Sequence, residues 1–303
     1  MSGRSMSVLE RVLVALALWV QAPAAADACD ASITPVVATL RLDYDPFAFV
    51  RNAARLAVDI ENDGADACPV DVVLLDAARV SIAQSDVGNT GVQIGFVASA
   101  AGTNVAATTL PGVWRLTLDP AARTRFTIDT TVLRDAVATA GEHDLALTLE
   151  LRDAGTAIAH GSAIPIRVSV VAPPRAQMNI VGSAGAFGEG ASVAHVDFGV
   201  FENDARRRVY LQVRANTRGR LTIDSANRGR LLRNGDQAGE TGIPYAASLA
   251  DRTIDLTSHW EEVIDPPQSI AGTSLPLDLM VSTIGSHAEG TYSDVLTVEL
   301  SAL

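Results

Sequence analysis

Apolar and polar residues alternate with a period of two along most of this chain, and this pattern limits what it can fold into. Side chains of a β-strand point alternately to its two faces, so such runs indicate strands with one buried face. The clearest runs are residues 56–60, 145–151, 164–170, 209–213 and 275–281. Gly, Asn, Asp and Pro separate them, and one short helix is expected at residues 131–139. Many short strands at this length predict an all-β protein with two sandwiches or barrels.

Composition excludes several classes of function. The 303 residues carry 23 basic and 35 acidic groups, a net charge of −12, and every basic residue is arginine. The acidic balance argues against binding nucleic acid or an anionic membrane surface, because both need an excess of basic residues. Without lysine, Schiff-base chemistry and P-loop phosphate binding are excluded.

The first residues have the layout of a secretory signal peptide. Arg4 and Arg11 precede an apolar run at residues 12–20, and small residues follow up to Ala26. The apolar run has about nine residues, whereas a bilayer span needs roughly 20. We therefore expect residues 1–26 to be a signal peptide and the rest of the chain to be exported.

Cys29 and Cys68 are the two cysteines of the chain. In an oxidising compartment an isolated pair most often forms one disulfide, and two free buried thiols are the alternative. Their spacing and number exclude a zinc site or a redox C-x-x-C motif.

Motifs for catalysis or metal binding are missing from the sequence. The five histidines lack the spacing of metal ligands; they are His143, His160, His195, His259 and His287. Glu261, Glu262 and Asp265 beside Trp260 could form a glycosidase carboxylate set, but a solvated acidic loop fits better. We expect no catalytic residue, no cofactor and no metal.

The chain contains an internal repeat. Residues 42–47 match residues 196–201, and an alternating strand follows in each copy. Residues 147–151 (LTLEL) match residues 296–300 (LTVEL) at nearly the same offset. We place the boundary between the copies at Pro173-Pro174, which gives domains of residues 27–172 and 173–303.

The two copies end differently. The first continues through a turn at residues 152–161 into another alternating strand at residues 163–171, whereas the second stops at Leu303. A sandwich that lacks one strand exposes a hydrophobic groove and unpaired backbone groups, which fits the addition of a strand from a partner. Alternatively, the extra strand is an elaboration and both cores close alone.

The second copy resembles the spore coat protein U domain family. The resemblance is carried by Asp197-Phe198-Gly199, by Tyr245 in Ile-Pro-Tyr, and by the pattern Gly290-x-Tyr292-x-Asp294-x-x-x-Val298, which is its most specific mark. It covers residues 178–303 well and residues 29–151 more weakly. The family includes pilus subunits of the archaic chaperone–usher type in Gram-negative bacteria.

This resemblance implies two immunoglobulin-like β-sandwiches, of which the C-terminal one lacks its last strand. A periplasmic chaperone would first lend a strand, an outer-membrane usher would assemble the fibre at the cell surface, and a neighbouring pilus subunit would donate the final strand. The chain departs from the family because the second copy has no cysteine pair. It also has no free arm ahead of Cys29, which suggests a two-domain tip subunit with residues 29–172 outward.

Trp114 and two groups of arginines are the candidate contact residues of this chain. Trp114 follows a weakly polar stretch at residues 88–109, so it is either part of a surface-contact loop or a core residue. Arginines at residues 206–208 and 228–233 are either docking spots or solvated strand ends. The alternative to a pilus subunit is a solitary secreted or envelope-matrix β-sandwich protein that does not polymerise.

Overall fold

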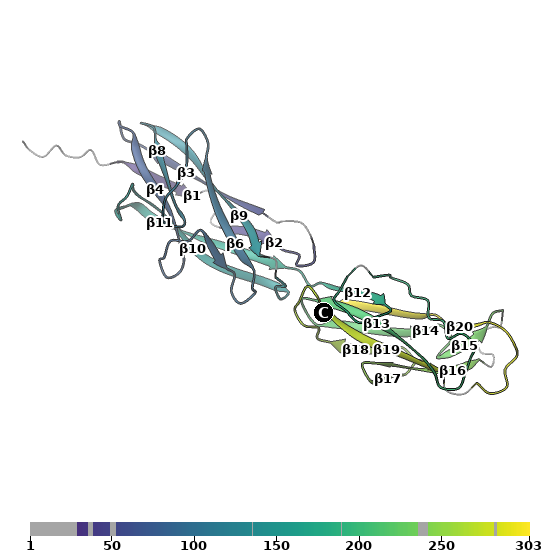
Figure 1. The fold of residues 1–303 in the computed structure, drawn as a ribbon. Coiled ribbons are helices and arrows are strands. Elements are labelled where there is room, and N and C mark those ends of the chain that lie inside the picture. Colours follow the sequence, from purple (N-terminus) through teal and green to yellow (C-terminus); the bar gives the residue numbers. More distant parts are fainter. Residues whose placement is uncertain are drawn as a thin grey trace, which may run out of the picture.

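The computed structural model describes residues 29–35, 39–48, 53–134, 136–188, 190–235, 242–281 and 284–303. The expected signal peptide lies outside these residues, so it stays a prediction. The described residues form strands and loops without a helix, and none of them contributes a helix that could cross a membrane. Figure 1 shows the strands gathered into two bodies that lie end to end. We call strands β1–β11 the first sandwich and strands β12–β21 the second sandwich.

The first sandwich packs a five-stranded sheet against a six-stranded sheet. The five-stranded order is β1 (Ala31–Pro35), β3 (Ala53–Asn62), β9 (Ala122–Arg134), β6 (Gln93–Ala100) and β5 (Gln84–Asp86). The six-stranded order is β2 (Thr39–Asp43), β11 (Ala159–Ala172), β10 (Gly141–Asp153), β4 (Cys68–Leu75), β8 (Val113–Leu118) and β7 (Ala106–Ala107). The inward residues of both sheets form one buried core.

The second sandwich also has two sheets, but one of them is small. The larger sheet has the order β12 (Ala176–Val181), β13 (Ala205–Ala215), β19 (Thr273–Val281), β16 (Ile243–Leu249), β15 (Arg230–Arg233) and β20 (Tyr292–Ser293), with β17 (Arg252–Ile254) beside β16. The smaller sheet is β18 (Trp260–Ile264), β14 (Gly219–Ser225) and β21 (Leu296–Ala302). A separate buried core lies between them.

Strand order confirms the repeat that the sequence predicted. The sheet order β1-β3-β9-β6 in the first sandwich recurs as β12-β13-β19-β16 in the second. In the other sheet, β10-β4-β8 recurs as β21-β14-β18. The sequence match of residues 147–151 with 296–300 therefore pairs β10 with β21. Among the described residues, β11 is the long strand of the first sandwich that has no counterpart in the second.

The two sandwiches are joined by specific contacts as well as by the chain. The Arg214 guanidinium lies over the rings of Phe47 in the first sandwich and Phe187 in the second, at 4.7 and 4.1 Å from their centroids. Asp45 accepts a hydrogen bond of 2.9 Å from Arg175. These contacts fix the orientation of the sandwiches on either side of the Pro173-Pro174 connection.

The predicted helix at residues 131–139 is wrong. Its first four residues are the end of β9, which pairs with β3 on one side and with β6 on the other. Threonine and valine favour strands because their branched side chains pack well on a pleated surface. Pairing of Thr131, Val132 and Arg134 with β6, and of Thr131 with β3, therefore overrides the weak helical pattern.

The predicted disulfide between Cys29 and Cys68 is present, with 5.4 Å between the Cα atoms. Cys29 lies just before β1 in one sheet, and Cys68 is the first residue of β4 in the other. The bond therefore links the two sheets of the first sandwich at the end where the described chain begins.

Replacing both cysteines with serine should destabilise the first sandwich. The bond closes a loop with a sequence separation of 39 residues, and the chain-entropy model gives a loss of about 4 kcal/mol for a loop of this length. Urea unfolding of the full chain with and without the substitutions measures this loss. Thiol titration of the unfolded, unreduced protein should find no free thiol, and two reactive thiols would contradict the structure.

Candidate functional site

The edge of β21 is the most unusual feature of the second sandwich. β21 pairs with β14 along its whole length, from Leu296 opposite Ser225 to Ala302 opposite Gly219. Within the described residues no strand pairs with its other edge. The matching strand of the first sandwich, β10, has β4 on one side and β11 on the other. The open edge of β21 therefore lies where the first sandwich holds β11.

Apolar residues that match in the repeat differ systematically in burial. In the first sandwich they are at most 9% exposed, whereas their partners in the second are only partly buried. The pairs are Leu42/Val196, Tyr44/Phe198, Phe47/Phe201, Leu56/Val209, Leu147/Leu296, Leu149/Val298 and Leu151/Leu300. Other matched pairs, such as Val58/Leu211 and Ile60/Val213, are fully buried in both sandwiches. Most of the first-sandwich residues in the changed pairs lie on or just after β2 and β10, the two strands that flank β11, so the loss of burial goes with the missing strand. The second-sandwich residues of the changed pairs line what we call the acceptor groove.

Strand β11 shows what fills this space in the first sandwich. Its inward side chains Ile164, Ile166, Val168 and Val170 are between 0% and 7% exposed. They alternate with residues that face away from the core, and β11 runs antiparallel to β10. A strand of this pattern beside β21 would cover the acceptor groove in the same way.

A second backbone edge borders the same space. In the first sandwich β2 pairs with β11 in parallel, from Thr39 opposite Arg167 to Asp43 opposite Val171. By the repeat, the counterpart of β2 is residues 193–197, which form no strand. Val193 is 80% exposed there and Val200, a little further on, is 90% exposed. An incoming strand could thus bond to β21 on one side and to residues 193–197 on the other.

Two residues named from the family resemblance meet near the beginning of β21. The Tyr245 hydroxyl donates a hydrogen bond of 2.6 Å to Oδ2 of Asp294, and the Ser225 hydroxyl donates another of 2.6 Å. The other carboxylate oxygen accepts from the backbone N–H groups of Asn227 and Val295, at 2.9 and 2.8 Å. Asp294 therefore holds β16, the β14–β15 turn and the start of β21 together. Its role is structural support for one end of the acceptor groove.

The Asp197-Phe198-Gly199 motif forms a turn beside the groove. Gly199 has a positive φ of 71°, which glycine adopts without strain, and its N–H donates to Oδ1 of Asp197 at 2.8 Å. The Arg207 side chain donates to the carbonyl oxygens of Asp197 and Phe198 at 2.8 and 2.9 Å. This turn presents the Phe198 ring to the groove.

Aromatic rings gather where this turn meets the last motif. Phe201 lies 6.4 Å from Phe198 and 6.1 Å from Tyr292 between ring centroids. The Tyr292 hydroxyl donates to the carbonyl of Ala288 at 2.7 Å. At Gly290 a Cβ atom would lie 2.8 Å from the Arg233 side chain, so only glycine fits without movement. The motif positions thus form two groups, the Tyr245–Asp294 pair and this aromatic cluster.

Sequence reasoning missed two apolar residues of the second core. Met178 and Ile180 on β12 are partly buried and pack against the same core. The alignment of β12 with β1, which follows from the repeat, would have pointed to them.

The surface-contact prediction for Trp114 is wrong, and the core alternative holds. Its side chain is 6% exposed and its ring lies 6.2 Å from that of Phe126 inside the first core. Trp114 is in β8, where alternation turns it inward and leaves Arg115 outside. The exposed apolar residue of this region is Leu110, in the preceding loop.

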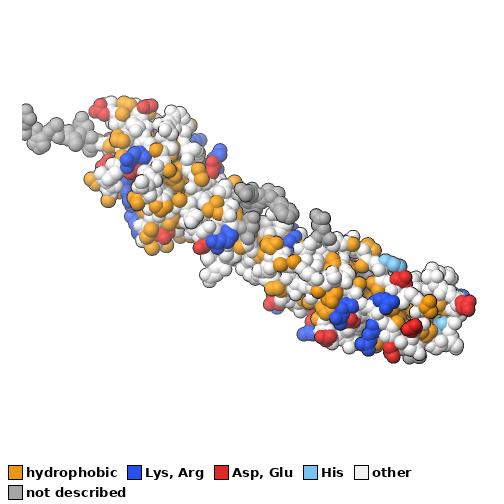
Figure 2. All heavy atoms as spheres, in the orientation of Figure 1, with side chains coloured by type: hydrophobic (Ala, Val, Ile, Leu, Met, Phe, Trp, Pro, Cys, Tyr) orange, Lys and Arg blue, Asp and Glu red, His pale blue; other side chains and the backbone are white. Residues whose placement is uncertain are grey.

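Several charged side chains on the second sandwich form ion pairs. Arg208 makes two hydrogen bonds of 2.7 and 2.8 Å to Asp278, and Arg220 lies 3.0 Å from Glu261. Glu262 pairs with Arg252. Figure 2 shows basic and acidic side chains interspersed on the face that it draws. Glu261 and Glu262 therefore belong to ion pairs on a sheet.

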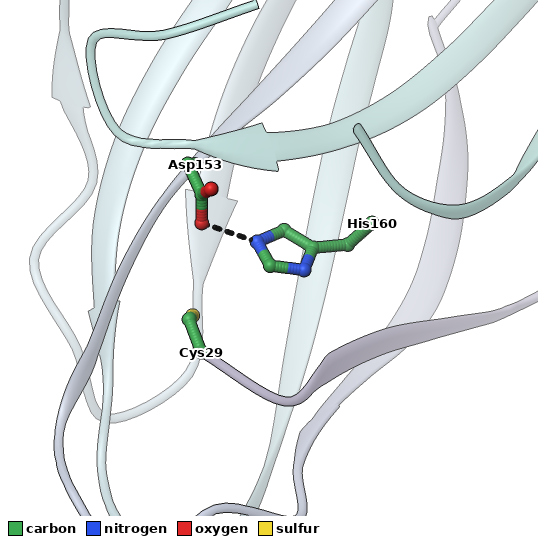
Figure 3. Close-up of side chains that lie close together, drawn as sticks. All are labelled: Cys29, Asp153 and His160. Atoms are coloured by element: carbon green, nitrogen blue, oxygen red, sulfur yellow. Dashed lines mark hydrogen bonds and ion pairs between the residues drawn. The ribbon is translucent and has the colours of Figure 1, made fainter. Parts of the chain in front are cut away.

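One group of potential metal ligands lies in the first sandwich. Cys29, Asp153 and His160 approach within 4.8 Å of one another, and Nε2 of His160 lies 2.6 Å from Asp153 (Figure 3). The sulfur of Cys29 is bonded to Cys68, so it offers no thiolate to a metal. The Asp153–His160 pair instead ties the end of β10 to the start of β11.

No protein-family model and no curated protein matches this chain. Solved structures similar to this chain include several chaperone–usher pilus proteins. One chain of the CsuC–CsuE chaperone–tip adhesion subunit complex, from archaic Csu pili of Acinetobacter baumannii, has 12% identity to this protein. The match covers 89% of this chain and 99% of that chain, with a TM-score of 0.41. The CupB6 tip adhesin of Pseudomonas aeruginosa has 14% identity over 89% and 94%, with a TM-score of 0.35. A mutant of the CFA/I adhesin CfaE of enterotoxigenic E. coli has 11% identity over 90% and 81%, with a TM-score of 0.37.

A matched pair of substitutions tests the difference in burial. Leu147→Ala removes a side chain that is 3% exposed, and such a change costs about 2–5 kcal/mol. Leu296→Ala removes the same side chain at the matching position of the open groove, so its effect should be below about 2 kcal/mol. Urea unfolding of each sandwich in the full chain measures both values. Equal losses would show that the two positions are equally buried.

Tyr245→Phe should destabilise the second sandwich by about 1–3 kcal/mol, because it removes a hydrogen bond to a carboxylate. Burial, with the hydrogen bond to Asp294, raises the pKa of Tyr245. Its phenol therefore stabilises the folded state below the ordinary tyrosine pKa of about 10, and this stability is lost as the pH rises above it. Unfolding midpoints from pH 8 to pH 11 should converge for wild type and variant. A constant difference across this range would contradict the raised pKa.

Proposed function

We propose that this protein is an exported, non-catalytic pilus subunit whose second sandwich is completed by a strand from another protein. The single observation that carries the proposal is the difference in burial between the matched residues of β10 and β21. A periplasmic chaperone would supply the strand during export, and a neighbouring pilus subunit would replace it at an outer-membrane usher. The resemblance of the Gly290–Val298 pattern to the spore coat protein U family supports this assignment.

The proposed domains are residues 27–172 and 173–303, and we place the subunit at the fibre tip. Residues 31–35 already form β1 inside the first sandwich, and Cys29 is bonded to Cys68. Donating this segment to a neighbour would require breaking both the strand and the disulfide. The subunit thus accepts a strand from another protein, whereas its own described N-terminal residues are not free to be donated to a neighbour. In this arrangement the first sandwich faces outward and carries the adhesive surface.

The energy available from filling the groove is large enough to drive assembly. A strand like β11 would bury about four apolar side chains, each worth roughly 1.5–3 kcal/mol when fully buried. That sum is comparable with the net stability of a whole domain, about 5–15 kcal/mol. The second sandwich lacks a disulfide that could offset the missing strand, since both cysteines lie in the first.

Fusing a donor strand to the chain tests the proposal. A copy of residues 159–172, joined after Leu303 by a short Gly/Ser linker, would lie antiparallel to β21 as β11 does to β10. The melting temperature of the second sandwich should rise by about 10 °C or more, since about 1 kcal/mol corresponds to roughly 4–8 °C in a domain of 60–100 residues and to roughly 2–4 °C in one of 150–250 residues, and residues 173–303 lie between these sizes.

The matched control is the same fusion with serine at the donor copies of Ile164, Ile166, Val168 and Val170. It should melt like the unfused chain, because its backbone can pair with β21 but its side chains cannot fill the groove. If both fusions leave the melting temperature unchanged, the sandwich is already closed. That result would favour a solitary secreted or envelope-matrix protein.

A further inference from the structure

Glu299 on β21 faces away from the core, next to the open edge. It lies directly opposite Thr222 of β14, and Thr222 lies opposite Glu261 of β18, so the three form one row across the sheet. The row lines a shallow depression together with Arg220 and His259. Arg220 is engaged with Glu261, and His259 with Asp224. In the described part of the chain, the Glu299 carboxylate has no ion pair or hydrogen bond.

The same glutamate in the first sandwich is fully paired. Glu150 holds this position in the matching sequence of β10 and is 5% exposed. Arg152 donates to it at 2.6 and 3.1 Å, and Arg79 donates to its other oxygen. Burial raises the pKa of Glu150, but the hydrogen bonds from the two arginines outweigh burial and lower it.

The second sandwich keeps the glutamate and an arginine, Arg228, at the position that matches Arg79, but Ser301 takes the position of Arg152. Among the described residues no ion pair joins Arg228 to Glu299, and Arg220, which lines the same depression as Glu299, is paired with Glu261. The side of Glu299 away from β14 is the side on which a strand would add to β21. A carboxylate that has lost its partners therefore stands beside the vacant strand position.

We propose that the strand completing the second sandwich carries an arginine or lysine on its outward face beside Glu299. This inference rests on the proposed function. It adds a requirement for a charged residue to the requirement that the strand's apolar residues fill the acceptor groove. The partner is thus a peptide segment with alternating apolar residues facing the groove and a basic residue between them. An outward aspartate or glutamate at that position would meet Glu299 directly and be disfavoured.

The first sandwich indicates where the basic residue belongs. Leu149 pairs with Ile164, and after a register shift Leu151 pairs with His160, so residues 161–163 of β11 lie beside Glu150. Ala163 is exposed and immediately precedes the inward Ile164. In a donor copied from β11, the position of Ala163 is therefore the one beside Glu299.

Three versions of the fused donor test this requirement, with Ala163→Arg, Ala163→Ser or Ala163→Glu in the donor copy only. The arginine donor should make the unfolding equilibrium constant of the second sandwich about five-fold smaller than the glutamate donor does, with serine between them. Raising the salt concentration to 1 M should remove most of this difference, because exposed charges are screened.

Charge reversal at the acceptor identifies the partner of the basic residue. In a chain that carries Glu299→Arg, the glutamate donor should stabilise the second sandwich more than the arginine donor does. Glu202→Arg, at an exposed glutamate outside β21, is the matched control and should leave the order unchanged.

Equal stabilisation by all three donors would overturn the charge requirement while leaving strand addition intact. The charge requirement would also be overturned if the arginine donor still stabilises the second sandwich more than the glutamate donor in the Glu299→Arg chain. Failure of every donor to stabilise the sandwich would overturn the proposed function, and the charge requirement with it.

Discussion

A β-strand whose edge has no partner dictates the properties of the second sandwich. β21 supplies one row of apolar side chains to the core, but nothing in the described chain covers them on the side away from β14. Both the apolar side chains and the free backbone groups favour pairing with another strand. The groove and its partly buried apolar lining are consequences of this one vacancy, whereas the isolation of Glu299 follows from Ser301 at the position of Arg152 and from the pairing of Arg220 with Glu261.

The first sandwich shows the completed form of the same scaffold. There β11 pairs with β10 and β2, and the matched apolar residues become buried. A disulfide further stabilises it, so it can hold its shape without a partner. The Arg214 contacts with Phe47 and Phe187 connect this stable body to the open one. The molecule therefore combines, in one chain, a closed sandwich with a sandwich whose last described strand has an open edge.

Much of this arrangement could be predicted from the sequence, because alternation identifies strands and a repeat identifies matching strands. The LTLEL and LTVEL segments alone located both β10 and β21, and Tyr245 and Asp294 were named before they were seen to meet. Local pattern failed at residues 131–139, where pairing with β3 and β6 decided the structure. Local pattern also could not decide whether Trp114 is buried, because the alternation that turns this residue inward depends on where β8 begins. The isolation of Glu299 depends on where Arg220 points, which no sequence pattern reports.

Amide hydrogen exchange along β21 and β10 tests the central claim most directly. In the chain without a donor, we expect every second amide of β21 to exchange quickly, because the N–H groups on the open edge face solvent. The matching amides of β10 should be protected throughout. Fusion of the β11 copy should protect the remaining amides of β21. Uniform protection of β21 in the unfused chain, equal to that of β10, would show that the edge is already covered and would contradict the account.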